Sequence, residues 1–178
     1  LELIKRPPMV GATVRAGVHT NFGALTGPSV ALEGDVRLAF VHRNLFLALG
    51  AGYSTAAREL AQQSPIAFTV ATRTHAVPVN LSLLYRLRLG ERGLLYGGGG
   101  GDALFVQSRL QPSFETVPRV ENSAVLGFHA RAGAGYELGG GALIADLRYT
   151  RARLPDGGAL SGDIGGLTAT AGYRFSFF

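Results

Sequence analysis

The chain has 178 residues, of which 16% are charged and 47% hydrophobic, with a formal net charge of +5. It contains no cysteine, which excludes disulfide bonds and thiol chemistry, and its four histidines are too scattered for metal binding, so we expect no metal and no other cofactor. The basic residues are dispersed singly between apolar residues instead of forming a cluster, so we expect no nucleic-acid partner.

Residues 1–9 include the stretch KRPP, which is typical of the end of a linker. We predict a linker or N-terminal extension over residues 1–9 and one folded domain over residues 10–178, with a further domain expected upstream. The chain has no uninterrupted run of about 18 apolar residues, so its sequence predicts no transmembrane helix.

Apolar and polar residues alternate along most of the chain, which is the period of a β-strand. Each alternating segment has about ten residues, the length that a tilted strand needs to cross a bilayer. A helical turn competes only at residues 56–63. The eight predicted strands cover residues 10–19, 30–40, 45–54, 77–86, 94–106, 124–137, 142–151 and 167–177.

The connections between these segments alternate between long and short. Barrels of bacterial outer membranes have long outside loops and short periplasmic turns. With an even number of strands, both termini are expected on the periplasmic side. The long connections are residues 20–27, 55–73, 108–122 and 152–163, and the short ones are residues 41–44, 87–93 and 138–141.

One face of these strands carries charged residues of both signs. A barrel of eight strands has an interior just wide enough for side chains, so opposite charges can fill it as pairs. The predicted charge network of the lumen comprises Arg15, Glu33, Asp35, Arg37, Asp102, His129, Arg131, Glu137, Asp146, Arg148 and Arg174. The pairs that we expect, as alternatives, are Arg15 with Glu33 or Asp35, and Arg131 or Arg148 with Asp146 or Glu137.

The opposite face is apolar and is expected to contact lipid. Its large aromatic residues gather near the strand ends, as in the two aromatic girdles of membrane barrels. Toward the short turns we place Phe40, Tyr85, Tyr136, Tyr173 and Phe177, and toward the long loops Tyr53, Phe105 and Tyr149.

A run of five glycines, residues 97–101, interrupts the fifth segment. A nucleotide-binding glycine loop would require a following helix, which the sequence does not predict. Successive residues of a strand point to opposite faces, which places Gly98 and Gly100 in the lumen. The same alternation places Gly97, Gly99 and Gly101 on the lipid face, where they would form a groove for an acyl chain, a neighbouring aromatic or another protein. We therefore expect Gly99→Leu to be tolerated and Gly100→Leu to disrupt the barrel.

Strand number, loop alternation and a charged lumen make residues 10–178 similar to the OmpA/OmpX-like small eight-stranded outer-membrane β-barrels. The C-terminal sequence AGYRFSFF resembles the family's last strand, which the barrel-insertion machinery recognises. The resemblance implies an all-β, eight-stranded antiparallel up-and-down transmembrane barrel in a bacterial outer membrane. It also implies membrane lipids and lipopolysaccharide as partners, together with a protein partner in the envelope.

The function that we predict is non-enzymatic: a membrane anchor or a component of an envelope protein complex. The alternatives are a lipid A-modifying enzyme and a narrow pore for small solutes. A lipid A deacylase would need a lipid-facing histidine beside a serine, whereas His19 and His129 point inward by parity, so we assign no catalytic residue.

Two of the outside connections are long for such a small barrel. The apolar alternation of Ile66, Phe68 and Val70 predicts that the fourth strand begins early, with a break of phase before Val77. Their arginines would suit recognition of lipopolysaccharide or of a partner; these are Arg58, Arg73, Arg109 and Arg119.

Overall fold

The computed structural model describes residues 9–21, 26–62, 68–112, 117–154 and 162–177. These ranges contain nine strands and no helix long and apolar enough to cross a membrane. The strands are β1 (Val10–Thr20), β2 (Thr26–Arg37), β3 (Leu45–Gln62), β4 (Phe68–Leu89), β5 (Gly93–Pro112), β6 (Arg119–Leu138), β7 (Gly141–Leu154), β8 (Gly162–Asp163) and β9 (Gly166–Phe177).

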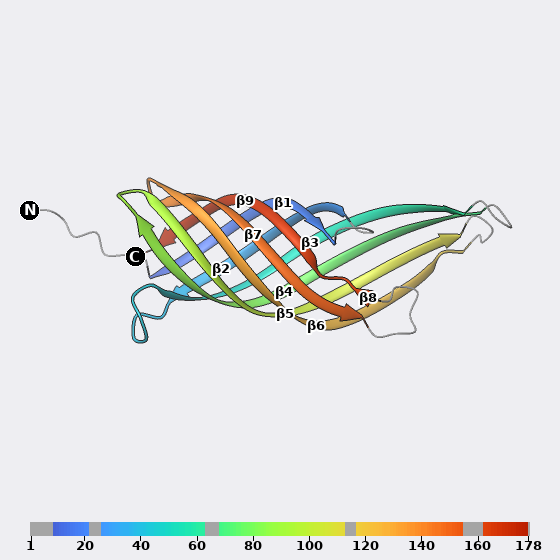
Figure 1. Ribbon diagram of the computed structural model, residues 1–178, viewed down its shortest axis with the longest axis horizontal. Coiled ribbons are helices and arrows are strands. Elements are labelled where there is room, and N and C mark those ends of the chain that lie inside the picture. The colour runs from blue at the N-terminus through green and yellow to red at the C-terminus, as the bar shows by residue number, and fades with distance from the viewer. Residues whose placement is uncertain (1–8, 22–25, 63–67, 113–116, 155–161, 178) are drawn as a thin grey trace, which may run out of the picture.

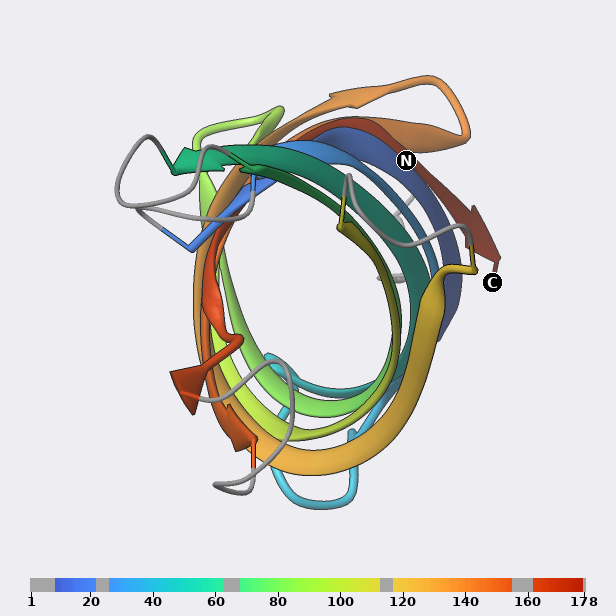
Figure 2. The ribbon, with the colours of Figure 1, turned by 90° about the vertical axis from the view of Figure 1, so that its right-hand side faces the viewer.

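Eight of these strands form a closed antiparallel barrel (Figures 1 and 2). Each strand from β1 to β7 pairs with the next, and β9 closes the ring by pairing with both β7 and β1. The two-residue strand β8 pairs only with the end of β7. The predicted fold class is confirmed, and closure leaves no open sheet edge in the ring of eight strands.

The hydrogen-bond register sets the tilt of the strands. A path that starts at Val10 and steps across all eight strands through paired residues returns to β1 at Thr20, ten residues further along. A displacement of this size for eight strands corresponds to a steep tilt of roughly 40°. Figure 1 shows this tilt in all the long strands.

Strands β3 to β6 are longer than the sequence predicted, at 18, 22, 20 and 20 residues. A bilayer requires about 9–11 residues of a tilted strand, so these four extend beyond it at one end of the barrel (Figure 1). The helical turn considered for residues 56–63 is wrong where the structure describes it, because β3 continues through Gln62 and pairs there with Phe68.

Strand β4 begins at Phe68, as predicted, but has no break of phase. Its register with β5 is unchanged from Val70 to Leu89. Thr72, Thr74 and Asn80 are buried while Val77 is exposed, so the even positions on both sides of Val77 point inward. The hydropathy pattern misled the prediction because beyond the membrane the outward face need not be apolar.

The short connections lie at the end of the barrel where β1 begins and β9 ends. Gly90 and Gly139 occupy left-handed backbone conformations in two of these turns, with φ of 63° and 59°. In the third connection β2 ends at Arg37. Phe40 therefore lies in the turn, whereas the sequence had placed it at the end of the second strand.

The predicted boundary between linker and barrel falls within the described residues only at Met9. Its backbone nitrogen donates to the carbonyl of Phe177 (3.0 Å), and its carbonyl accepts from the nitrogen of Arg37 (2.8 Å). Met9 therefore belongs to the barrel by hydrogen bonding, whereas residues 1–8 lie outside the described residues.

Candidate functional site

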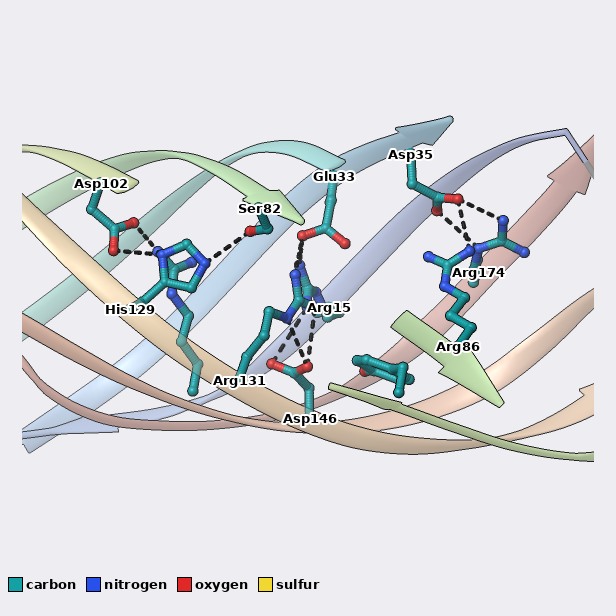
Figure 3. A network of polar contacts seen from close by, with 12 residues as sticks. Arg15, Glu33, Asp35, Ser82, Arg86, Asp102, His129, Arg131, Asp146 and Arg174 are labelled. Atoms are coloured by element: carbon teal, nitrogen blue, oxygen red, sulfur yellow. Dashed lines mark hydrogen bonds and ion pairs between the residues drawn. The ribbon is translucent and has the colours of Figure 1, made fainter. Parts of the chain in front are cut away.

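The lumen is filled by charged side chains that form three clusters along the barrel (Figure 3). We call these the inner, central and outer clusters, counting from the end with the short turns. Each combines residues from several strands, because successive inward positions are two residues apart and the tilt brings non-adjacent strands to the same level.

The inner cluster is built around Asp35 of β2, whose side chain is fully buried. Arg86 of β4 donates to Asp35 Oδ1 at 2.8 Å, and Arg174 of β9 donates to both carboxylate oxygens at 2.7 and 2.9 Å. The Arg86 guanidinium also lies 4.0 Å from the centre of the Phe46 ring, a cation–π contact. Asp35 is thus held by two cations from different sides of the barrel.

The central cluster contains two arginines and two carboxylates. Glu33 of β2 accepts from Arg15 of β1 at 2.6 Å and from Arg131 of β6 at 2.5 Å. Arg131 also donates to Asp146 of β7 at 3.0 Å, and Arg15 lies 3.5 Å from the same carboxylate. All four side chains are no more than 4% exposed, and each charge faces two opposite charges.

The outer cluster joins Ser82, His129, Asp102 and Arg148. His129 Nδ1 lies 2.8 Å from Asp102 Oδ2, and His129 Nε2 lies 2.8 Å from the Ser82 hydroxyl. A carboxylate only accepts, so Nδ1 carries the proton in the bond to Asp102. Arg148 forms an ion pair with the other oxygen of Asp102.

Serine, histidine and aspartate in this order resemble the arrangement of a hydrolase triad. The serine, however, has no exposed surface, and the side chains of His129 and Asp102 are also fully buried. Neither cavity described in the barrel is lined by Ser82 or His129. In this arrangement the hydrogen bonds orient the histidine within the lumen, and the serine hydroxyl is covered.

Two members of the predicted lumen network lie elsewhere. Arg37 is at the inner rim, where its Nε donates to the backbone carbonyl of Arg43 at 2.6 Å. Glu137 pairs with Arg88 at 2.6 Å, and both side chains are substantially exposed. Both residues are close to the short turns, where the lumen opens to solvent. The structure brings the other nine together in the three clusters.

Two further residues take part in the lumen clusters although they were not predicted to do so. Arg86 was absent from the predicted charge network, yet it is buried against Asp35. Ser82 was not singled out, although it shares the inward parity of Asn80 and Arg86. The alternation of inward and outward residues along β4 was the signal that could have identified both residues.

A cavity that we call the vestibule reaches from the central cluster, past Arg148, toward the end of the barrel with the long connections. Its empty volume, counted out to its open mouth, is about 980 Å³. Its floor includes Arg15, Asn80 and Arg148, and Leu104 and Val106 contribute apolar wall. A second cavity of about 240 Å³, lined by Tyr96 and Ile144 among others, lies between the inner and central clusters.

The outward face is apolar, with exposed aromatic side chains at two levels. Tyr85 pairs with Gly97 of β5, and Phe105 follows eight residues later on that strand. Eight residues of a strand tilted by roughly 40° rise about 20 Å, close to the apolar band of about 25 Å in membrane barrels. The remaining predicted aromatics on the outside are Tyr53, Tyr136, Tyr149, Tyr173 and Phe177.

The lipid-facing surface differs between the two sides of the barrel. On β2 to β4 it carries large residues such as Leu32, Leu49 and Leu81, all exposed. On the other side glycines and alanines of β5, β6, β7 and β9 form a cluster, as in the paired row Ala134, Ala145 and Ala171. Exposed large residues such as Phe128, Leu143 and Leu147 border this cluster. We call the cluster the Gly/Ala face; it comprises Gly97, Gly99, Gly101, Ala130, Ala132, Ala134, Ala145 and Ala171.

The five glycines of β5 tolerate a side chain to different degrees. A Cβ at Gly98 or Gly100 would overlap a backbone carbonyl of β4. On the lipid face, a Cβ would lie 3.7 Å from the nearest carbonyl oxygen at Gly97 and 4.0 Å at Gly101. At Gly99 it would lie 2.7 Å from the His129 oxygen, which does not fit the expected tolerance of Gly99→Leu.

Metal binding has no support in the part of the chain that the structure describes, because no group of three or more potential ligands occurs there. No protein-family model matches the sequence, and no curated protein matches it.

Solved structures share the fold at low sequence identity. A major outer membrane protein from Thermus thermophilus aligns with a TM-score of 0.64 at 14% identity, over 97% of this chain and 100% of that one. Neisserial surface protein A aligns with a TM-score of 0.57 at 14% identity, over 94% and 96% of the two chains. The attachment invasion locus protein Ail of Yersinia pestis gives 0.50 at 14% identity, over 94% and 97%.

These likenesses show the fold, and the chemistry of the surface agrees with it. A closed ring of strands, an apolar outside with aromatics at two levels and a charged interior are together typical of barrels that cross a membrane. By fold the chain is a small eight-stranded antiparallel β-barrel, similar to solved barrels of bacterial outer membranes, and the chemistry of its outer face suits a membrane.

Proposed function

We propose that the protein is a non-enzymatic barrel that serves as a membrane anchor or as a component of an envelope protein complex. The observation that carries this proposal is the mutual pairing of the lumen charges. In the central cluster Glu33 is bound by Arg15 on one side and by Arg131 on the other. An interior filled in this way stabilises a rigid scaffold and opposes the continuous water path that a pore requires.

The Gly/Ala face supports a role in a complex. In lipid, small residues favour association because they let the backbones of two proteins approach closely. Lipid alone makes no distinction between two sides of one barrel, yet glycines and alanines cluster on one side of this barrel, beside the exposed Phe128 and Leu147. We propose that a membrane-embedded segment of a partner protein packs on the Gly/Ala face.

Site-specific photo-cross-linking in native membranes tests this function. A photoreactive residue at Ala132, on the Gly/Ala face, is expected to yield one discrete product of higher mass. The matched control is Leu81, which also faces lipid but on the opposite side, and it is expected to yield none. Equal products from both positions, or lipid adducts alone, would contradict a partner at this face.

Contact with lipopolysaccharide is the second part of the proposal. Arg73 of β4 and Arg109 of β5 are direct cross-strand neighbours, and both are exposed beyond the apolar band. Like charges opposite each other are unfavourable unless an anion lies between them. We expect Arg73→Gln combined with Arg109→Gln to reduce the lipopolysaccharide that copurifies with the barrel, whereas Arg92→Gln at the inner turn should not.

A lipid-modifying enzyme is the alternative that one observation favours, namely the order of Ser82, His129 and Asp102. The burial of the serine opposes it. Lipid A mass spectra that change when the gene is deleted, and recover with wild-type protein but not with Ser82→Ala, would establish the enzyme in place of the anchor.

A further inference from the structure

We propose that the vestibule in the outer half of the lumen binds a small amphipathic carboxylate. Its charged head is held at the Nε atoms of Arg15 and Arg148. Its apolar body lies against the wall that contains Leu104 and Val106. This ligand site is independent of the proposed anchor function, because it uses the lumen and not the outer face.

Buried polar atoms without a hydrogen-bond partner gather around the vestibule. Among the described residues, four buried side-chain atoms have no hydrogen-bond partner. All four belong to residues that line the vestibule: Arg15 Nε, Thr74 Oγ1, Asn80 Oδ1 and Arg148 Nε. Buried polar groups in native proteins are almost always paired. Their concentration in one cavity therefore indicates an occupant that pairs with them.

The two arginines of the vestibule indicate that the occupant carries a negative charge. The guanidinium groups are held in place by their other nitrogens, because Arg15 donates to Glu33 at 2.6 Å and Arg148 pairs with Asp102. Each therefore directs its remaining N–H at a fixed angle. Charge-assisted hydrogen bonds to a carboxylate are the strongest that such a donor forms. Asp146 also lines the vestibule, but its carboxylate is already paired with Arg15 and Arg131.

Thr74 and Asn80 extend this polar floor. The two residues are 5% and 2% exposed, so neither free oxygen is compensated by bulk solvent. The threonine hydroxyl can donate to the same carboxylate. The Asn80 oxygen accepts, so it requires a hydroxyl group of the ligand or a water molecule that the ligand retains.

The vestibule has an apolar wall as well as a polar floor. Leu104 and Val106 are buried in one cluster with Val125 and Ala152, and Ala76 and Ile164 pack against it. Leu104, Val106, Ala76 and Ile164 all line the vestibule. Pockets for small molecules are mostly apolar with a few placed polar groups. The vestibule meets this description, with an apolar body expected to be a short chain or a single ring.

The test uses the full-length barrel in nanodiscs with labelled isoleucine methyl groups, and hexanoate as the probe. Ile164 lines the vestibule and Ile144 lines the separate inner cavity, so they serve as reporter and internal control. Hexanoate is expected to shift the Ile164 methyl signal saturably and to leave Ile144 unchanged. Hexylamine, with the same chain and the opposite charge, is expected to shift neither.

Two kinds of variant separate binding from folding. Arg148→Gln removes one donor and is expected to weaken hexanoate binding by roughly tenfold or more. Ala56→Leu fills the vestibule without touching an ion pair and is expected to abolish the shift. Ala57→Leu, on the adjacent outward position, is the matched control and should bind as wild type.

The proposal is overturned by any of three results. In the first, the Ile164 methyl signal shows no saturable shift, which would mean that water alone fills the vestibule. In the second, hexanoate and hexylamine give equal responses. In the third, the Ala56→Leu variant binds hexanoate as well as wild type. None of these results bears on a partner at the Gly/Ala face, so failure here leaves the cross-linking test of the anchor function intact.

Discussion

Arg131 of β6 and Glu33 of β2 meet at 2.5 Å although their strands stand on opposite sides of the barrel, four strands apart in either direction. The pair therefore spans the lumen from wall to wall. It ties the first hairpin of the chain to the sixth strand through side chains alone, so the barrel is braced across its diameter as well as around its circumference.

Glu33→Ala is expected to destabilise the barrel strongly, because it leaves two buried arginines, Arg15 and Arg131, to share the single carboxylate of Asp146. Removing one partner of a buried pair typically costs about 3–5 kcal/mol. The free energy of unfolding, measured in urea by the shift of heat-modifiable gel mobility, checks this. Glu137→Ala breaks the exposed pair with Arg88 and should cost at most about 1 kcal/mol. Equal losses in the two variants would contradict a bracing role for the central cluster.

The wild-type barrel is expected to show no discrete conductance steps in planar bilayers. Glu33→Ala is also expected to show none, because the inner cluster of Asp35, Arg86 and Arg174 stands in series with the central one. Single-channel recording at both polarities is the measurement. Reproducible steps from wild-type protein would favour the pore over the anchor.

Ser82 is expected to resist active-site labelling. A fluorophosphonate probe reacts with an activated serine only if it can reach the hydroxyl, and Ser82 has no exposed surface. Intact-protein mass spectrometry of the barrel in detergent should therefore show no adduct. An adduct that disappears in Ser82→Ala would revive the enzymatic hypothesis.

Gly100→Ala is expected to lower the folded fraction and Gly101→Ala to leave it unchanged. A Cβ at Gly100 would overlap the carbonyl oxygen of Leu81, whereas at Gly101 it would lie 4.0 Å from the nearest atom, the Gly127 oxygen. Overpacking of this kind typically costs about 1–3 kcal/mol. The folded fraction after refolding into micelles measures the difference, and similar yields for both would contradict the facing that we assign to β5.

The orientation of the barrel can be tested with single cysteines, because the native chain has none. Arg73→Cys lies on the long extension of β4 and is expected to react with an impermeant maleimide on intact cells. Arg92→Cys lies in a short inner turn and is expected to react only after the outer membrane is opened. The reverse pattern would place the short turns outside.

The eight strands were predictable because each alternates between a lipid-facing and a lumen-facing residue, and that period is local in the sequence. The extension of β3 through Gln62 was not predictable, since outside the membrane the outer face of a strand need not be apolar while backbone pairing continues. The same change of environment produced the false break of phase before Val77.

The ion pairs were predictable only between neighbours. Arg15 with Glu33 and Arg131 with Asp146 were among the expected alternatives, because their strands are adjacent in the chain. The bond from Arg131 to Glu33 depends on the displacement of ten residues around the barrel, which no single hairpin reveals. The burial of Arg86 was missed for the same reason.

The lumen clusters also bear on the order in which the molecule is assembled. Glu33 and Asp35 emerge in the first hairpin, but Arg131 and Arg174 follow 98 and 139 residues later. A nascent barrel that lacks its last strands therefore carries two carboxylates that each miss one of their two arginine partners, and lipid penalises such incompletely compensated charge. We therefore expect release into the membrane to be coupled to arrival of the C-terminal strand.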